Sequence, residues 1–171
     1  YFMRKSSLLG LLLLGLVTGF VYLLLRQTKK SFSAQEEALS RIEKIASRIP
    51  GVVYQYRLRL DGSSYFPFAS DAIEQIYRVS AKEVKEDASK VFRVLHPEDI
   101  EGIVTSINQS ATNLTPWKHE YRVKFNDGTV RWLYGNAIPE KEKDGSTLWH
   151  GFIDDITEQK TLEYELKKMN E

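Results

Sequence analysis

Histidine and carboxylate side chains are the groups in this sequence best suited to bind a metal ion, and His150, Asp154 and Asp155 lie close together. Such nitrogen and oxygen ligands are common at zinc and other transition-metal sites. The surrounding residues predict a β-strand, in which His150 and Asp154 share one face while Asp155 points to the other. The three groups cannot converge on one ion, so we predict no metal site here.

Other reactive chemistry is also missing from the sequence. There is no cysteine, which excludes disulfides, cysteine-ligated zinc, iron–sulfur clusters and a thiol nucleophile. We find no nucleophile elbow, P-loop or zinc spacing. The net charge of +1 gives no bulk field that would attract nucleic acid. We therefore predict neither catalytic residues nor a nucleic-acid partner within these residues.

The stretch from Trp117 to Thr157 predicts the elements around which the chain is organised. Apolar and polar residues alternate from Trp117 to Phe125, which is typical of a half-buried strand. Two further strands follow, at residues 130–138 and 147–156, and the turns between the three contain Asp127-Gly128 and Asp144-Gly145. The last strand is apolar on both faces, so we expect it at the centre of the sheet.

Two earlier strands and three helices are predicted upstream of these. The strands are Val52–Leu60 and Tyr65–Phe68, joined at Asp61-Gly62, and Pro67 favours an edge position for the second. Capping-box patterns at Asp71–Glu74 and Ser80–Glu83 predict two short helix starts. A longer helix is predicted from the sequence His96-Pro97-Glu98-Asp99, with Pro97 in the first helical position. The whole is a small α+β domain over residues 50–157.

An apolar segment at residues 6–25 is long enough to span a membrane, and basic residues flank it on both sides. A signal peptide is a poorer match, because the run is too long and no small-residue cleavage site follows. The basic residues favour the C-terminal side as cytoplasmic. Gly15 and Gly19 form a GxxxG pair that would let two such helices approach closely.

Helices are predicted on both sides of the α+β domain. Residues 31–49 form a linker helix with apolar residues at heptad spacing, and they predict either a parallel two-stranded coiled coil or a single amphipathic helix. The residues in question are Ala38, Ile42, Ile45 and Ile49. Residues 158–171 form a charged exit helix with an apolar stripe of Leu162, Leu166 and Met169. Because the sequence begins with Tyr1, we expect a piece of a longer protein or a start at Met3.

Five short motifs, in order, resemble the PAS domain family, in the PAS-fold-3 type of bacterial sensors. They are Ile49-Pro50-Gly51-Val52-Val53-Tyr54, His96-Pro97-Glu98-Asp99, Glu120-Tyr121-Arg122, Asp127-Gly128 with Arg131-Trp132, and residues 151–157, Gly-Phe-Ile-Asp-Asp-Ile-Thr. The resemblance implies a five-stranded antiparallel sheet in the order 2-1-5-4-3 with helices on one face. It also implies a non-catalytic module that senses, dimerises or relays.

The resemblance further implies roles for individual residues. In the closing motif, Asp155, Ile156 and Thr157 would form the signal relay, with Asp155 anchoring the sheet end and Thr157 capping the exit helix. The family also implies a ligand pocket between helices and sheet, and we expect it to be lined by His119, Tyr121, Val123, Trp132 and Tyr134.

No cofactor is predicted, although an unknown small ligand would fit the family. The absence of cysteine excludes flavin–cysteine photochemistry. Haem is not expected, because His96 belongs to a helix-starting motif and His119 to the apolar face of a strand.

The expected function is a cytoplasmic PAS sensory or relay module of a protein in the inner (cytoplasmic) membrane. It would act as a homodimer and signal to an output domain in the same chain. A histidine kinase is the first expectation for that output. A diguanylate cyclase or phosphodiesterase is one alternative, and a ligand-free dimerisation or interaction module is another.

Overall fold

The structure is a computed structural model that describes residues 16–30, 44–45 and 51–170. The chain divides into two compact units, Tyr1–Lys44 and Ile45–Glu171. In the first, residues 16–30 form a helix with exposed apolar side chains. None of the helices within the described ranges combines the length and the apolar character that crossing a membrane requires.

Several predictions about the N-terminal flank fall outside the described residues. The predicted span at residues 6–25 is described only from residue 16 onward. Of the linker helix at residues 31–49, only residues 44 and 45 are described, as helix. The predicted contact residues that lie outside are Gly15, Ala38, Ile42 and Ile49.

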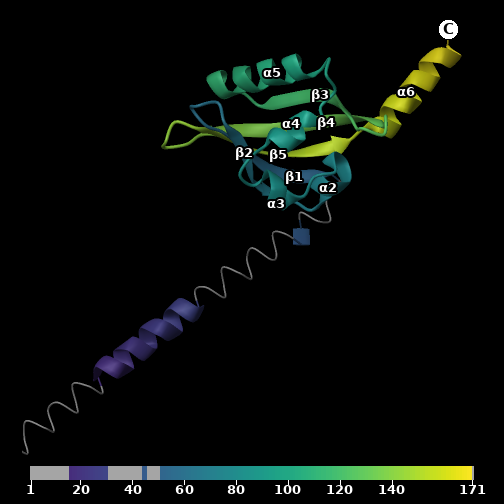
Figure 1. The fold of residues 1–171 in the computed structure, drawn as a ribbon. Helices are drawn as coiled ribbons and strands as arrows, with labels where there is room; N and C mark the ends of the chain where they lie inside the picture. The colour runs from purple at the N-terminus through teal and green to yellow at the C-terminus, as the bar shows by residue number, and fades with distance from the viewer. Residues whose placement is uncertain (1–15, 31–43, 46–50, 171) are drawn as a thin grey trace, which may run out of the picture. The chain divides into compact units, whose positions relative to one another are not determined.

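The second unit is built on a five-stranded antiparallel sheet in the order β2-β1-β5-β4-β3, as predicted (Figure 1). The strands are β1 Val52–Leu58, β2 Ser64–Ala69, β3 Trp117–Lys124, β4 Val130–Lys141 and β5 Thr147–Asp155. β5 lies at the centre and pairs with β1 on one side and β4 on the other. Its two apolar faces in the sequence therefore predicted its position correctly.

Three hairpins of the sheet close through the same local device, an Asp-Gly turn. In each turn the aspartate Oδ1 accepts a hydrogen bond from the backbone N–H two residues further on, at 2.9 Å for Asp61, 2.9 Å for Asp127 and 3.0 Å for Asp144. The glycine that follows has a φ between +83° and +85°, a left-handed conformation that side chains with a Cβ rarely adopt. The Asp-Gly pairs thus set where each strand ends.

Four helices lie between β2 and β3, and they cover one face of the sheet. They are α2 Ala72–Tyr77, α3 Ala81–Val84, α4 Ser89–Arg93 and α5 Ile100–Asn113, and the exit helix α6 is Thr157–Met169. The prediction of three helices missed α4. This helix is too short to show an apolar period, and its start is marked only by Asp87, whose carboxylate accepts from the Ser89 N–H at 2.8 Å.

The two predicted capping boxes have different outcomes. Ser80 and Glu83 form a true capping box, with each side chain accepting from the other residue's backbone N–H at the start of α3. At Asp71 the predicted helix start is confirmed, because α2 begins at Ala72, but the Asp71 side chain makes no capping bond.

The motif His96–Asp99 is a turn rather than the first turn of a helix, and α5 begins only at Ile100. The reason is that its carboxylates are directed at β3. Asp99 accepts from the Arg122 guanidinium at 2.6 and 3.0 Å and from the Arg122 backbone N–H at 2.8 Å, while Glu98 accepts from the same guanidinium at 2.8 Å. The motifs His96-Pro97-Glu98-Asp99 and Glu120-Tyr121-Arg122 therefore form one ion-pair cluster, which fixes the start of α5 to β3.

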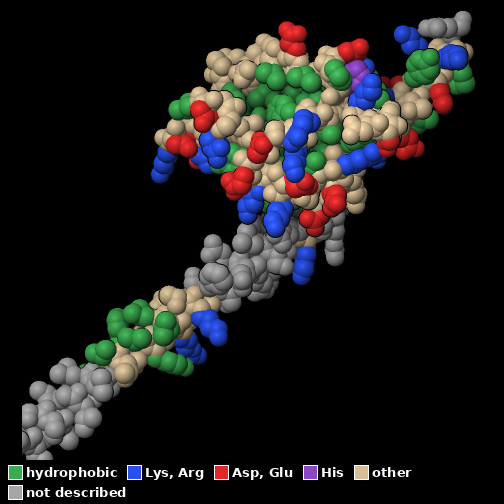
Figure 2. Space-filling model, viewed as in Figure 1, with side chains coloured by type: hydrophobic (Ala, Val, Ile, Leu, Met, Phe, Trp, Pro, Cys, Tyr) green, Lys and Arg blue, Asp and Glu red, His purple; other side chains and the backbone are tan. Residues whose placement is uncertain are grey.

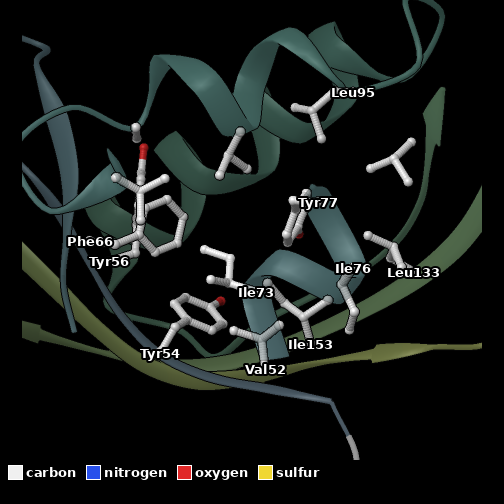
Figure 3. Close-up of a cluster of buried hydrophobic side chains, with 14 of the residues drawn as sticks. Val52, Tyr54, Tyr56, Phe66, Ile73, Ile76, Tyr77, Leu95, Leu133 and Ile153 are labelled. Atoms are coloured by element: carbon white, nitrogen blue, oxygen red, sulfur yellow. The ribbon is translucent and has the colours of Figure 1, made fainter. Parts of the chain in front are cut away.

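The hydrophobic core lies between the sheet and the helices (Figure 3). β1 contributes Val52, Tyr54 and Tyr56, and α2 contributes Ile73 and Tyr77, all of them buried. Since burial of apolar area is the main favourable term in folding, this layer of side chains is expected to supply most of the stability of the domain. The predicted alternation of β3 is also confirmed, because its apolar face is the inner one.

We predict that Asp99→Asn lowers the free energy of unfolding at neutral pH by about 2 kcal/mol, because it removes charge-assisted bonds from a half-buried pair. The Arg122 guanidinium lowers the pKa of Asp99 below its ordinary value. A carboxylate with a lowered folded-state pKa stabilises the fold above its unfolded pKa and loses this contribution as pH falls through the folded one. The difference between wild type and Asp99→Asn should therefore shrink below about pH 4.

Urea unfolding of both proteins across acid pH measures this difference. Glu98→Gln is the matched control, because the Glu98 side chain is 73% exposed and accepts only one hydrogen bond from the Arg122 guanidinium. A pH-independent difference between wild type and Asp99→Asn would contradict the ion-pair interpretation.

Candidate functional site

A cavity of about 50 Å³ lies between the sheet and the helices. Most of the side chains around it are aromatic, and none is charged. β1 contributes Tyr54 and Tyr56, the central strand β5 contributes Trp149 and Ile153, and β3 contributes Tyr121. Because burying an unpaired charge is costly, such a lining selects for neutral, apolar groups.

Two buried phenols on the cavity wall bond to each other. The hydroxyl groups of Tyr77 in α2 and Tyr121 in β3 share a hydrogen bond, and both side chains are almost fully buried. Burial raises the pKa of both phenols well above the ordinary value, and the pKa of Tyr54 is raised for the same reason. All three therefore stay neutral through the physiological pH range.

The polar edges of the two cavity tryptophans are satisfied by serines on α5. The Trp117 indole N–H donates to Ser106 Oγ at 2.9 Å, and the Trp149 indole N–H donates to Ser110 Oγ at 2.9 Å. Among the described residues, no buried side-chain nitrogen or oxygen lacks a hydrogen-bond partner. The cavity thus offers a bound molecule apolar contact rather than free hydrogen-bonding groups.

Small residues in the sheet let the aromatic rings lie close to it. A Cβ on Gly135 of β4 would overlap the Trp117 ring, and a Cβ on Gly151 of β5 would overlap the backbone of Asn136 and the side chain of Ala137. Gly135 therefore lets the Trp117 ring lie directly on β4, and Gly151 lets β5 lie close to Ala137 of β4.

The second candidate site is the expected signal relay at Asp155, Ile156 and Thr157, where the central strand leads directly into the exit helix. β5 ends at Asp155 and α6 begins at Thr157, with buried Ile156 between them. The Thr157 hydroxyl accepts from the Trp132 backbone N–H of β4 at 3.0 Å and donates to Asp155 Oδ1 at 2.5 Å. The first residue of α6 is therefore bonded to the neighbouring strand.

This geometry corrects the role expected for Thr157 at the junction. Thr157 does not cap the exit helix, because its hydroxyl is bonded to Trp132 and Asp155. Asp155 instead accepts from the Thr157 backbone N–H at 3.0 Å, which satisfies one donor of the first helical turn. On the outer face, Lys160 pairs with Glu120 of β3 at 2.6 Å and adds a second link between α6 and the sheet.

Comparison with known proteins agrees with this architecture. A sequence profile described as the PAS fold matches residues 66–153, about half of the chain. The chain belongs to the PAS-fold family. No curated protein sequence matches it.

Solved PAS structures share the fold at low sequence identity. The N-terminal domain of a diguanylate cyclase with PAS/PAC sensor from Marinobacter aquaeolei is 18% identical with a TM-score of 0.51, covering 63% of this chain and 97% of its own. A sensory box histidine kinase/response regulator from Burkholderia thailandensis is 19% identical with a TM-score of 0.52, covering 69% and 87%. A domain described as a light and redox sensing histidine kinase from Haloarcula marismortui is 23% identical with a TM-score of 0.53, covering 69% and 99%.

The PAS core places the five predicted pocket residues in different environments. Tyr121 lines the cavity. His119 is half-buried on the same strand face, with its ring stacked on Trp117 at a centroid distance of 6.1 Å, and it does not reach the cavity. Val123 is fully buried and pairs with Leu95 rather than lining the cavity.

Trp132 and Tyr134 require a correction, because they lie on the outer face of the PAS sheet. Trp132 pairs with Arg122 and Tyr134 with Glu120, and both partners point away from the core. The inward positions of β4 are instead Leu133, Gly135 and Ala137. The expectation was wrong because it combined inward-facing residues of β3, such as Tyr121, with residues of β4 that point to the opposite face of the sheet.

The other candidate histidines lie apart from the cavity. His150 is on the outer sheet face, between the Gln55 side-chain amide at 3.2 Å and the Glu140 carboxylate at 2.9 Å. His96 sits in the turn before α5, where its Nδ1 accepts from the Glu98 N–H at 3.4 Å.

Most cavity residues of this PAS domain were not chosen from the sequence, although a signal for some of them was present. Tyr54 and Tyr56 share the apolar face of β1, and Trp149 and Ile153 share one face of the predicted central strand. Strand parity was thus the better guide, because inward-facing aromatics of β1, β3 and β5 line the cavity whereas the outward-facing Trp132 and Tyr134 of β4 do not. The contributions of α4 and α5 depend on packing that no local pattern reveals.

We predict that Tyr77→Phe and Tyr121→Phe each lower the free energy of unfolding by about 1–3 kcal/mol, because each leaves one buried hydroxyl without its partner. The double variant should lose clearly less than the sum of the two, since both hydroxyls are then gone. A double-mutant cycle measured by urea unfolding gives this coupling energy. Strict additivity would show that the two phenols do not bond in solution.

Proposed function

We propose that this chain is the sensory and relay module of a membrane-bound signalling protein. A change in the PAS core would pass through the β5–α6 junction to an output module that follows the exit helix. The observation that carries the proposal is the continuity between the cavity and the helix. Ile153 contacts the cavity, and four residues later Thr157 begins α6 and bonds to β4.

The exit helix supports a dimeric mode of action. Its stripe, Leu162, Leu166 and Met169, is 52–74% exposed. Residues spaced by four and three along a helix lie on one side, and their burial against a second copy would remove this apolar area from water. We propose that two chains pair through this stripe and through the heptad positions of the linker, of which Ile45 is 64% exposed.

The setting we propose is the inner (cytoplasmic) membrane, with residues 6–25 spanning it and the PAS domain in the cytoplasm. The basic residues after the apolar segment support this orientation. The output we propose first is a histidine kinase, and a diguanylate cyclase or phosphodiesterase is the alternative. PAS-fold structures named as sensor parts of both a histidine kinase and a diguanylate cyclase are similar to this chain.

The reading frame beyond residue 171 tests the proposed output directly. We expect it to continue into a long helix with a phosphoacceptor histidine, or into a GGDEF-type cyclase module. A stop codon shortly after residue 171 would overturn the proposal of an output domain in the same chain.

For the relay itself, we predict that Thr157→Val loosens α6 while the PAS core stays folded. Valine has nearly the same shape but cannot accept from the Trp132 N–H, which leaves a partly buried donor unpaired at a cost of about 1–3 kcal/mol. Hydrogen exchange should therefore speed up at the start of α6, and output activity of the full-length protein should change.

Thr161→Val is the matched control, because the Thr161 hydroxyl donates to the Thr157 carbonyl at 2.9 Å, a bond within the same helix rather than to a strand. If both variants change α6 exchange and output equally, the junction is not a specific coupling element.

A further inference from the structure

A groove of about 850 Å³ opens beside the cavity, between α5, α4 and the β1–β2 hairpin. Three side chains, Tyr56, Phe92 and Ile107, belong to the walls of both spaces. The groove and the cavity are therefore neighbours that share part of their walls. Hydrophobic side chains are visible at the surface between α5 and α4 (Figure 2).

From this arrangement, we infer that the cavity and the groove form one binding site for a single-chain amphiphile with an anionic head, such as a fatty carboxylate. The apolar end would enter the aromatic cavity, and the head would stay at the rim of the groove, next to Lys141. The inference rests on the proposed sensory function and specifies its ligand class.

The size of the two spaces supports a shared site. At about 50 Å³ the cavity alone is well below the roughly 150 Å³ of an engineered protein cavity that binds benzene. The groove, at about 850 Å³, falls within the roughly 300–1,000 Å³ range of ligand pockets. A ligand that lies in the groove and places only a chain end in the cavity satisfies both dimensions.

The chemistry of the walls changes along this path. No charged side chain lines the cavity, and its tryptophan N–H groups are already bonded to serines, so the inner part suits a hydrocarbon. The groove keeps apolar walls through Leu58, Val104 and Ile107, but hydroxyl and charged side chains line it as well. An apolar end inside and a polar end outside match this gradient.

The positive charge of Lys141 favours a ligand with a negatively charged head group. It pairs with Thr147 at the end of β4 on the inner side of the sheet, and its Nζ donates to Thr147 Oγ1 at 3.4 Å. Within the described part of the chain, no carboxylate lies within 4 Å of its ammonium group, whereas Lys90 and Lys160 both have one at 2.6 Å. An anionic head would supply the missing charge partner.

Two of the other three charged groups of the groove, Arg59 and Asp87, are already engaged. Arg59 donates to Ser63 at 3.2 Å and lies over the Tyr65 ring. Asp87 accepts from the Ser89 N–H and hydroxyl at the start of α4. Glu86 lies beside Asp87 on the α4 side, so a cationic head is the alternative that the experiment must exclude.

The test uses the full chain in lipid nanodiscs, with its three tryptophans labelled as 5-fluorotryptophan. Decanoate, decanol and decyltrimethylammonium are titrated and followed by fluorine NMR. We expect decanoate to shift the Trp149 and Trp117 resonances in a saturable way. Trp132, on the outer sheet face, should not move and serves as an internal control.

Lys141→Gln should weaken decanoate binding by roughly three- to fivefold, the effect of one partly exposed ion pair, and leave decanol binding unchanged. Lys143→Gln, an exposed lysine in the adjacent turn, should change neither. Equal binding of the cationic probe, or equal loss in both lysine variants, would overturn the anionic head.

If no probe moves Trp149 or Trp117, or if Trp132 moves together with them, the binding site itself is overturned, and a ligand-free interaction module becomes the better account of the fold. The Thr157→Val experiment needs no ligand. Failure of the ligand site therefore leaves the relay untouched, and failure of the relay leaves the binding data interpretable.

Discussion

The central strand β5 is the constraint on which the rest of this domain depends. It is hydrogen-bonded to β1 on one side and β4 on the other along nearly its whole length, so it cannot shift without disturbing both neighbours. Its inner face carries Trp149 and Ile153 at the cavity, and its C-terminal end continues into α6 (Figure 1). A single element therefore joins the apolar interior to the helix that leaves the domain.

Two polar clusters fix the surrounding elements to this sheet. Arg122 holds the start of α5 to β3 through Asp99 and Glu98, and Ser106 and Ser110 of α5 hold the two cavity tryptophans. These contacts fix the position of α5 over the sheet. The same helix lines both the cavity and the groove, so its position affects the shape of both spaces.

The sequence was a good guide wherever a local pattern decides the structure. Alternation identified the strands, Asp-Gly pairs placed the turns, and the two apolar faces of β5 placed it at the centre. The longer helix predicted from His96–Asp99 is confirmed as α5, but its start was placed three residues too early, because the carboxylates of the motif have their partner, Arg122, in another element more than twenty residues away. α4 was missed because five residues are too few to show a helical period.

The candidate site was harder to predict than the fold. The register of the β3–β4 hairpin pairs Trp132 with Arg122, so the hairpin turn already contained the information that Trp132 faces outward. The groove is different in kind, because its walls come from two helices, a hairpin and the end of β4, and no single stretch of sequence describes it. Tertiary packing alone brings Lys141 to the same space as Ile107.

The most direct test of the coupling between cavity and helix is hydrogen exchange at the Lys160 amide, which donates to the Ile156 carbonyl in the first turn of α6. The exchange rate is measured for wild type, Ile153→Val, Thr157→Val and the double variant. The Lys124 amide of β3, which donates to the Val94 carbonyl, is the reference for changes elsewhere. The account predicts that Ile153→Val changes the Lys160 rate only when Thr157 is present. Equal effects of Ile153→Val with and without Thr157, or no effect in either background, would contradict it.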